Sequence, residues 1–130
     1  MRRCRRCPWK DAILLEAGVD IIEIERIEGA LARHGQRFLD RVYTEMEQRQ
    51  CRGRAESLAA RFAAKEATFK MLGRRFGWRE IEVRRQPSGK PILAFHGRAK
   101  ERADRLRVKE CSVSLSHSRG NAVAIVVASD

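Results

Sequence analysis

The chain has 130 residues, of which 43% are hydrophobic, and this length and composition favour one globular domain with its own core over a disordered chain. No apolar run approaches the roughly 20 residues that a membrane span needs, so we expect no transmembrane segment and a cytoplasmic location. The formal net charge is +11, from 28 Lys and Arg against 17 Asp and Glu. Such a charge implies an anionic partner: nucleic acid, a membrane surface, a phosphorylated small molecule or an acidic protein.

The first residues differ in composition from the rest. Residues 1–12 are rich in arginine and have little apolar periodicity, so we expect a disordered N-terminal extension before a single domain over 13–130. Cys4 and Cys7 have the spacing of half a zinc site. A structural zinc site needs four ligands, and no second close pair of Cys or His follows, so free thiols are the favoured interpretation.

The N-terminal half has the pattern of one strand followed by helices. Apolar and β-branched residues over 12–24 predict a buried strand. Apolar residues at helical spacing predict a helix over 24–34, and Thr44 with Glu47 three residues later forms a capping-box pattern that predicts a helix start near Thr44. The segment 55–72, rich in Ala, Leu, Lys and Glu, predicts the longest helix.

The C-terminal half has the pattern of strands and turns. Alternation over 78–85 and an apolar run over 92–95 predict a β-hairpin, because the residues between them, 87–91, are dense in Pro and Gly. The charged segment 97–107 predicts a short helix. Two further strands are predicted over 111–117 and 122–128. A few helices with mostly antiparallel strands predict the α+β class.

A carboxylate interrupts the first predicted strand. Asp20 lies among β-branched apolar residues, where an isolated charge is costly unless it is paired or binds a cation. Two interpretations stand equally: Asp20 is a cation ligand, or it ends the strand and caps a turn after Gly18.

A second carboxylate, Glu66, interrupts the apolar face of the longest predicted helix. The other residues of that face are Leu58, Phe62 and Phe69. One interpretation is an ion pair with Lys70, four residues later. The other is a metal ligand, with Lys65 and Lys70 nearby for phosphate, because Mg²⁺ is typically held by one or two carboxylates together with water and substrate phosphates.

Serines and a histidine gather at the end of the strand predicted over 111–117. Ser114, Ser116, His117 and Ser118 lie there beside Arg119. A Ser/His pair suggests a hydrolase, but the Gly-x-Ser-x-Gly turn between a strand and a helix is absent. From these residues alone, a solvent-facing polar strand edge is favoured.

Four segments, in this order, resemble the motifs of the holo-acyl-carrier-protein synthase family. They are Gly18–Ile27, Arg61–Ala67 with Lys70, Trp78–Val83 with Pro87–Pro91, and Ser114–His117. The resemblance implies an α+β 4′-phosphopantetheinyl transferase fold: a mostly antiparallel sheet packed by a long central helix and shorter helices. It also implies Mg²⁺-dependent transfer of 4′-phosphopantetheine from coenzyme A to a serine of apo-acyl carrier protein, releasing adenosine 3′,5′-bisphosphate. The product would serve fatty acid biosynthesis or polyketide carrier activation.

The resemblance also implies residue roles. Asp20 and Glu66 would be the magnesium ligands, and with Lys70 they would form the catalytic set. Coenzyme A would be contacted by Arg61, Lys65, Lys70, Ser116, His117 and Ser118. The acidic carrier would dock on Arg26, Arg33, Arg37 and Phe38. The family implies a homotrimer in which coenzyme A binds between adjacent subunits.

Two observations qualify these expectations. Residues 73–77 are shorter than the glycine-rich loop of many family members, although Arg74 and Arg75 remain available to a phosphate. The competing hypothesis is a basic nucleic-acid-binding protein, which the charge favours. Only eight aromatic residues are present, however, and they are not interleaved with basic residues as a stacking platform requires. We therefore expect neither nucleic acid nor a membrane as a partner.

Overall fold

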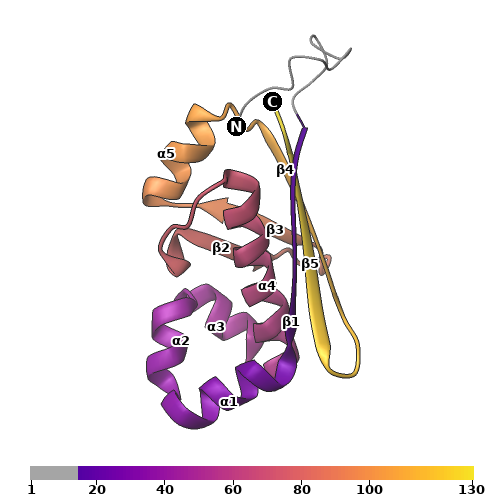
Figure 1. Cartoon of the computed structure of the whole chain (residues 1–130). Helices are drawn as coiled ribbons and strands as arrows, with labels where there is room; N and C mark the ends of the chain where they lie inside the picture. Colours follow the sequence, from indigo (N-terminus) through magenta and orange to yellow (C-terminus); the bar gives the residue numbers. More distant parts are fainter. Residues whose placement is uncertain (1–14) are drawn as a thin grey trace.

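The computed structural model describes residues 15–130, which form an α+β structure. The extension expected over 1–12, with Cys4 and Cys7, lies outside the described residues. Figure 1 shows a sheet on one side of the long helix α4 (Ala55–Leu72) and the shorter helices and a hairpin on the other. Within residues 15–130, no helix is both long and apolar enough to cross a membrane.

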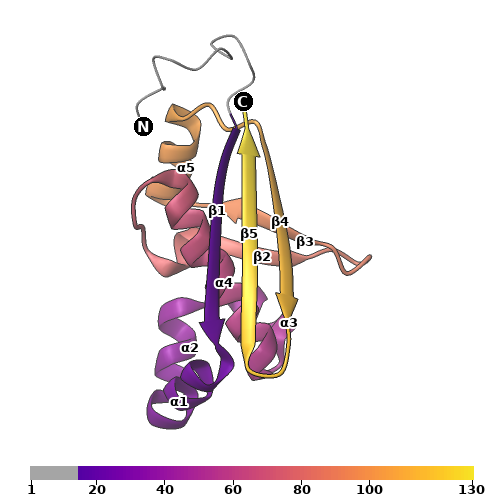
Figure 2. The ribbon, with the colours of Figure 1, turned by 45° about the vertical axis from the view of Figure 1, so that its right-hand side comes forward.

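The larger sheet is antiparallel, and its central strand is the last one in the chain. Strand β5 (Asn121–Ser129) lies between β1 (Leu15–Glu23) and β4 (Glu110–His117), as Figure 2 shows. The inner face of β5 is made of small residues: Ala122, Ala124, Val126 and Ala128 are buried. Their size allows α4, which is itself rich in buried alanines, to lie close against the sheet.

Strand β1 makes an especially close contact with α4. A Cβ atom at Gly18 would lie 1.9 Å from the carbonyl oxygen of Ala67, so only glycine fits there. The strand continues without a turn through Asp20 to Glu23 and leads directly into the helix that starts at Ile24. The interpretation of Asp20 as a strand-end residue that caps a turn is therefore wrong.

Three short helices connect β1 to α4. Helix α1 (Ile24–His34) has the predicted bounds, and a positive φ of 53° at Gly35 separates it from α2 (Gln36–Val42), which was not predicted. Helix α3 (Glu45–Cys51) begins with the predicted capping box, in which Thr44 Oγ1 accepts from the Glu47 amide. The break at Gly35 folds α2 back toward α3.

The smaller sheet is the hairpin of β2 (Ile81–Arg85) and β3 (Pro91–Phe95). The predicted strand over 78–85 starts later than expected, because residues 78–80 form a 3₁₀ turn, η1 (Trp78–Glu80). The Glu80 carboxylate accepts from the backbone amides of Gly77 and Arg98, which holds this turn against α5 (Gly97–Arg105). The hairpin turn extends beyond β4 (Figure 2).

Candidate functional site

Asp20 lies where β1 crosses α4. Its Oδ1 atom accepts a hydrogen bond from Lys70 Nζ at 3.0 Å, and Lys70 also donates to the Val19 carbonyl oxygen at 3.0 Å. The Asp20 side chain is 20% exposed and that of Lys70 is 56% exposed. The structure thus brings together two residues that are 50 positions apart, at the surface end of a strand-helix contact.

Glu66 lies one helical turn before Lys70 but pairs with a different residue. Its Oε1 atom is 3.2 Å from Arg75 Nη2, and Arg75 lies over the rings of Phe69 and Trp78. Among residues 15–130 no ion pair joins Glu66 to Lys70, so the predicted (i, i+4) pair is wrong. The reason is tertiary: β1 offers Lys70 an acceptor, and the loop after α4 offers Glu66 a donor.

Two half-buried carboxylates suit a divalent cation with oxygen ligands. Each carboxylate already has a cationic partner, Lys70 for Asp20 and Arg75 for Glu66, and an opposite charge nearby stabilises the ionised form that a cation ligand needs. Within the described part of the chain, no cluster of three or more His, Cys, Asp or Glu side chains is arranged to hold a metal ion. A cation here would complete its coordination with water and substrate oxygens, which is the usual pattern for Mg²⁺.

Lys65 precedes Glu66 in the chain but lies in the protein interior. Its ammonium group is fully buried and donates to Glu47 Oε1 at 2.8 Å, and to the carbonyl oxygens of Trp78 and Ile81. Burial lowers the pKa of Lys65, and the Glu47 carboxylate opposes that change. The expected contact between Lys65 and coenzyme A phosphates is incompatible with this structure, because the ammonium group has no exposed surface.

Arg61 and His117 line one cavity of about 570 Å³ between α4, the hairpin and β4. Arg61 is buried and donates to the Val83 carbonyl oxygen at 2.7 Å and to Gln50 Oε1 at 3.0 Å. Ser116 and Ser118 lie outside the lining of this cavity. The cavity also contains basic residues that the sequence analysis missed: Arg84, Arg85 and Lys90. Their position on a Pro- and Gly-rich hairpin beside the motif strand was the available signal.

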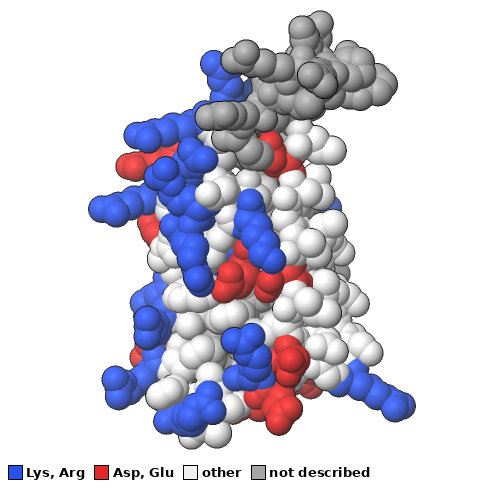
Figure 3. All heavy atoms as spheres, viewed as in Figure 1, with Lys and Arg blue, Asp and Glu red and all other residues white. Residues whose placement is uncertain are grey.

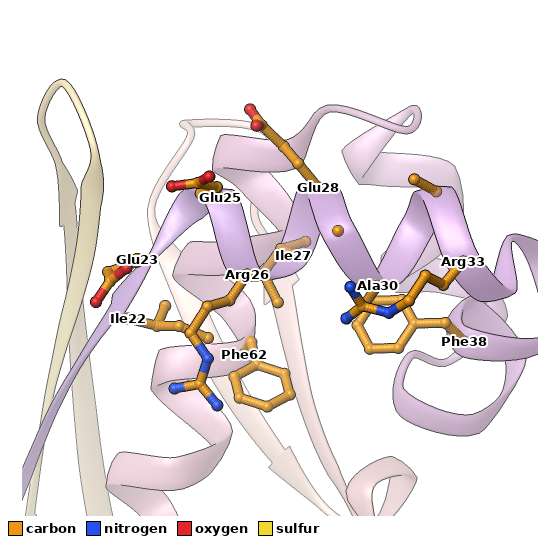
Figure 4. Close-up of a pocket in the computed structure, with 12 residues that line it drawn as sticks. Ile22, Glu23, Glu25, Arg26, Ile27, Glu28, Ala30, Arg33, Phe38 and Phe62 are labelled. Carbon is orange, nitrogen blue, oxygen red and sulfur yellow. The ribbon is translucent and has the colours of Figure 1, made fainter.

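A second cavity, of about 730 Å³, lies along α1 (Figure 4). Arg26 and Arg33 line it, and its apolar residues include Ile27, Phe38 and Phe62. Arg37 is exposed but does not line this groove. Phe38, which the resemblance assigns to the docking surface, is half-buried and packs edge-on against Tyr43 with 5.8 Å between the ring centroids. Three acidic residues also line the groove: Glu23, Glu25 and Glu28.

Comparison with known proteins shows which family the chain resembles. The family model described as the 4′-phosphopantetheinyl transferase superfamily matches residues 16–127. The chain is 52% identical over 124 residues to the holo-[acyl-carrier-protein] synthase of Herpetosiphon aurantiacus, covering 88% of this chain and 98% of that protein. It is 47% identical over 119 residues to the enzyme of Dehalococcoides mccartyi, covering 90% of this chain and 100% of that protein.

Solved structures agree with the sequence relatives. The holo-[acyl-carrier-protein] synthase of Helicobacter pylori in complex with coenzyme A superposes with a TM-score of 0.79 at 32% identity, covering 86% of this chain and 98% of that one. The Bacillus anthracis enzyme in complex with CoA (3′,5′-ADP) superposes with a TM-score of 0.73 at 35% identity, covering 91% and 98%. The α+β architecture expected from the motifs is therefore confirmed.

Proposed function

The chain belongs to the 4′-phosphopantetheinyl transferase superfamily and, within it, to the holo-[acyl-carrier-protein] synthases. We propose that it transfers 4′-phosphopantetheine with the help of Mg²⁺ and releases adenosine 3′,5′-bisphosphate. Coenzyme A would be the donor and a serine of an acidic acyl carrier protein the acceptor, for fatty acid or polyketide synthesis. The observation that carries the proposal is the contact between Asp20 of β1 and Lys70 of α4, with Glu66 one helical turn before Lys70 on the same helix.

The chemistry at this contact is charge neutralisation. Asp20 and Glu66 would hold Mg²⁺, which when bound neutralises the charge that develops on the pyrophosphate of coenzyme A. The ammonium group of Lys70 is half exposed beside Asp20, where it can turn toward a phosphate oxygen. The serine of the carrier must lose a proton, and a water oriented by Glu66 is one acceptor that this site offers.

The nucleotide end of coenzyme A fits the cavity that contains Arg61 and His117. The basic side chains of the hairpin, Arg84, Arg85 and Lys90, surround the same space, so the cavity suits a phosphate such as the 3′-phosphate. Because the Arg61 guanidinium is buried and already donates to Val83 and Gln50, we assign it to the wall of the cavity, and the exposed cations of the hairpin to direct phosphate contact.

The groove along α1 is the proposed docking site for the carrier. Arg26 and Arg33 would each pair with an acidic side chain of the partner, and Phe38 and Phe62 would receive an apolar side chain between them. Because Glu23, Glu25 and Glu28 line the same groove, the attraction would be confined to the two arginines. The exposed Arg37 adds positive charge on α2, outside the groove, and would act at longer range.

A homotrimer is proposed because the outer face of the larger sheet is apolar and uncovered. Leu15, Val19, Ile21 and Ile125 are 67%, 56%, 65% and 44% exposed. A contiguous apolar face of this kind marks an association surface. The nucleotide cavity lies on the hairpin side of α4 and the Asp20 site on its β1 side, so the two halves of one site would come from adjacent subunits.

The activity is tested by incubating the protein with coenzyme A, Mg²⁺ and an apo carrier protein. Mass spectrometry should then show one added phosphopantetheine on the carrier, and none when the acceptor serine is alanine or when EDTA removes the metal. An unmodified carrier together with tight, salt-dependent binding to duplex DNA would favour the nucleic-acid alternative instead.

A further inference from the structure

The loop that follows α4 and the helix α5 together form a strongly basic cavity of about 370 Å³. Two glutamates, Glu80 and Glu101, line it together with five arginines: Arg74, Arg75, Arg98, Arg102 and Arg105. Figure 3 shows Lys and Arg side chains gathered over α5 on this side of the molecule. The cavity borders the candidate metal site, because one of its arginines also contacts Glu66.

The arginines of this cavity are not equivalent. Arg102 Nε donates to the Leu72 carbonyl oxygen at 3.0 Å, which satisfies the C-terminal end of α4. Arg75 instead reaches Glu66 with one nitrogen at 3.2 Å, and its guanidinium lies 5.6 Å from the centre of the Trp78 ring. Arg75 is therefore the residue that links the basic cavity to a candidate magnesium ligand.

The contact between Arg75 and Glu66 is well suited to exchange. The Arg75 side chain is 70% exposed and makes a single, long contact with the carboxylate, and exposed pairs of this kind are weak. A divalent cation on Glu66 would repel the guanidinium, whereas a phosphate arriving beside it would offer the two-point acceptor that arginine prefers. The rings of Phe69 and Trp78 would keep the guanidinium near the site during the exchange.

We propose that Arg75 exchanges partners: it occupies Glu66 when no substrate is bound, and it binds a phosphate of coenzyme A when the divalent cation takes Glu66. This inference rests on the proposed function. It assigns to the short loop over 73–77 a charged contact with phosphate that replaces the longer glycine-rich loop. Without nucleotide, Arg75 thereby competes with the metal ion for Glu66. When metal and nucleotide are both present, Arg75 stabilises the complex by binding the phosphate.

The test uses Mn²⁺ as a paramagnetic probe and adenosine 3′,5′-bisphosphate as the nucleotide, with the full-length protein and no carrier. For Arg75→Gln, Mn²⁺ alone should bind about 2- to 5-fold more tightly, because a competing cation has been removed. In the presence of saturating Mn²⁺, the nucleotide should bind about tenfold more weakly, because a charge-assisted hydrogen bond has been lost. If Arg75 had only a structural role, Arg75→Gln would weaken both Mn²⁺ binding and nucleotide binding, or would change neither.

Two further variants sharpen the result. Arg98 lines the same cavity, but the arginine that contacts Glu66 is Arg75, so Arg98→Gln removes one positive charge from the cavity without freeing Glu66. This variant should not bind Mn²⁺ more tightly than the wild type. Equal effects of Arg98→Gln and Arg75→Gln on Mn²⁺ binding would overturn the inference, because the summed electrostatic potential of the cavity's arginines would then explain both. If the wild type binds Mn²⁺ and Glu66→Gln does not, the metal site is established. Unchanged Mn²⁺ and nucleotide binding by Arg75→Gln would then refute only the inference about Arg75. A wild type that binds no Mn²⁺ refutes both the metal site and the inference.

Discussion

Two neighbouring lysines of α4 show how single residues acquire different roles. Lys65 and Lys70 are five positions apart, yet Lys65 is completely buried and Lys70 is 56% exposed. Lys65 is stable in the interior because Glu47 and two carbonyl oxygens satisfy its three protons. Lys70 lies at the surface against Asp20, where its charge remains available to a substrate.

The carboxylates beside these lysines yield a prediction about the metal. Asp20→Asn and Glu66→Gln should each lower the transfer rate by more than about 100-fold, because an amide is a poor ligand for Mg²⁺. Both side chains are partly exposed, so the far-UV circular dichroism should stay that of the wild type. The measurement is the initial rate as a function of Mg²⁺ concentration. Wild-type rates in limiting Mg²⁺ would show that neither residue binds the metal.

At the scale of elements, the contact between β1 and α4 sets the geometry of the site. The strand can approach because Gly18 has no side chain to meet the Ala67 carbonyl oxygen. Asp20 is two residues further along the same face of β1, which brings its carboxylate within reach of Lys70. The position of the proposed metal ligand Asp20 therefore depends on the missing side chain at residue 18.

This contact predicts a cost for one added methyl group. In Gly18→Ala the new Cβ would collide with helix backbone, which cannot rotate away, so the free energy of unfolding should fall by about 1–3 kcal/mol. The transfer rate at a temperature where the variant is still folded should also fall, because β1 is displaced from α4. Urea denaturation and initial rates measure the two effects. Gly120→Ala is the matched control, since a Cβ there meets nothing within 4 Å, and equal behaviour of the two variants would contradict the account.

At the scale of the whole molecule, the basic side chains around α5 and the exposed apolar side chains of the larger sheet lie on different surfaces. Basic side chains cover the side formed by α5, as Figure 3 shows, while the outer face of the larger sheet exposes Leu15, Val19, Ile21 and Ile125. A net charge of +11 repels like molecules at long range, so association of copies needs an apolar contact of this kind. The sheet face would associate the subunits, and the charged sides would remain free for anionic substrates.

The proposed homotrimer predicts that two inactive variants can restore each other's activity. Glu66→Gln would remove the proposed metal ligand on the β1 side of α4, and His117→Ala would alter the proposed nucleotide cavity beside β4; each should be inactive alone. If the two variants are mixed, dissociated and reassembled, part of the activity should return, because some of the proposed shared sites would then contain both intact halves. Ile21→Lys should abolish the recovery, since it places a charge on the association face. Sedimentation of the wild type as a monomer at assay concentration would rule out a shared site.

The local features of the fold could be predicted from the sequence. The bounds of the helices over 24–34 and 55–72, the capping box at Thr44 and the antiparallel α+β class follow from periodicity and helix-end signals between near neighbours. The resemblance of the motifs also predicted the family. Helix α2 was missed because its seven residues carry too short a pattern. The start of β2 was misplaced because Trp78–Glu80 form a 3₁₀ turn, in which Glu80 accepts from the nearby Gly77 amide and the distant Arg98 amide.

The partners of the charged residues were decided only by the tertiary structure. From the sequence, Glu66 could be assigned to Lys70 by helical spacing, and the family resemblance implied a coenzyme A contact for Lys65. In the structure Lys70 bonds Asp20, Glu66 contacts Arg75 and Lys65 is buried against Glu47. Helical periodicity places a side chain on a face of its own helix, but its partner depends on which strand or loop packs there. For Lys70 that partner is 50 residues away, on a strand that reaches α4 because residue 18 is glycine.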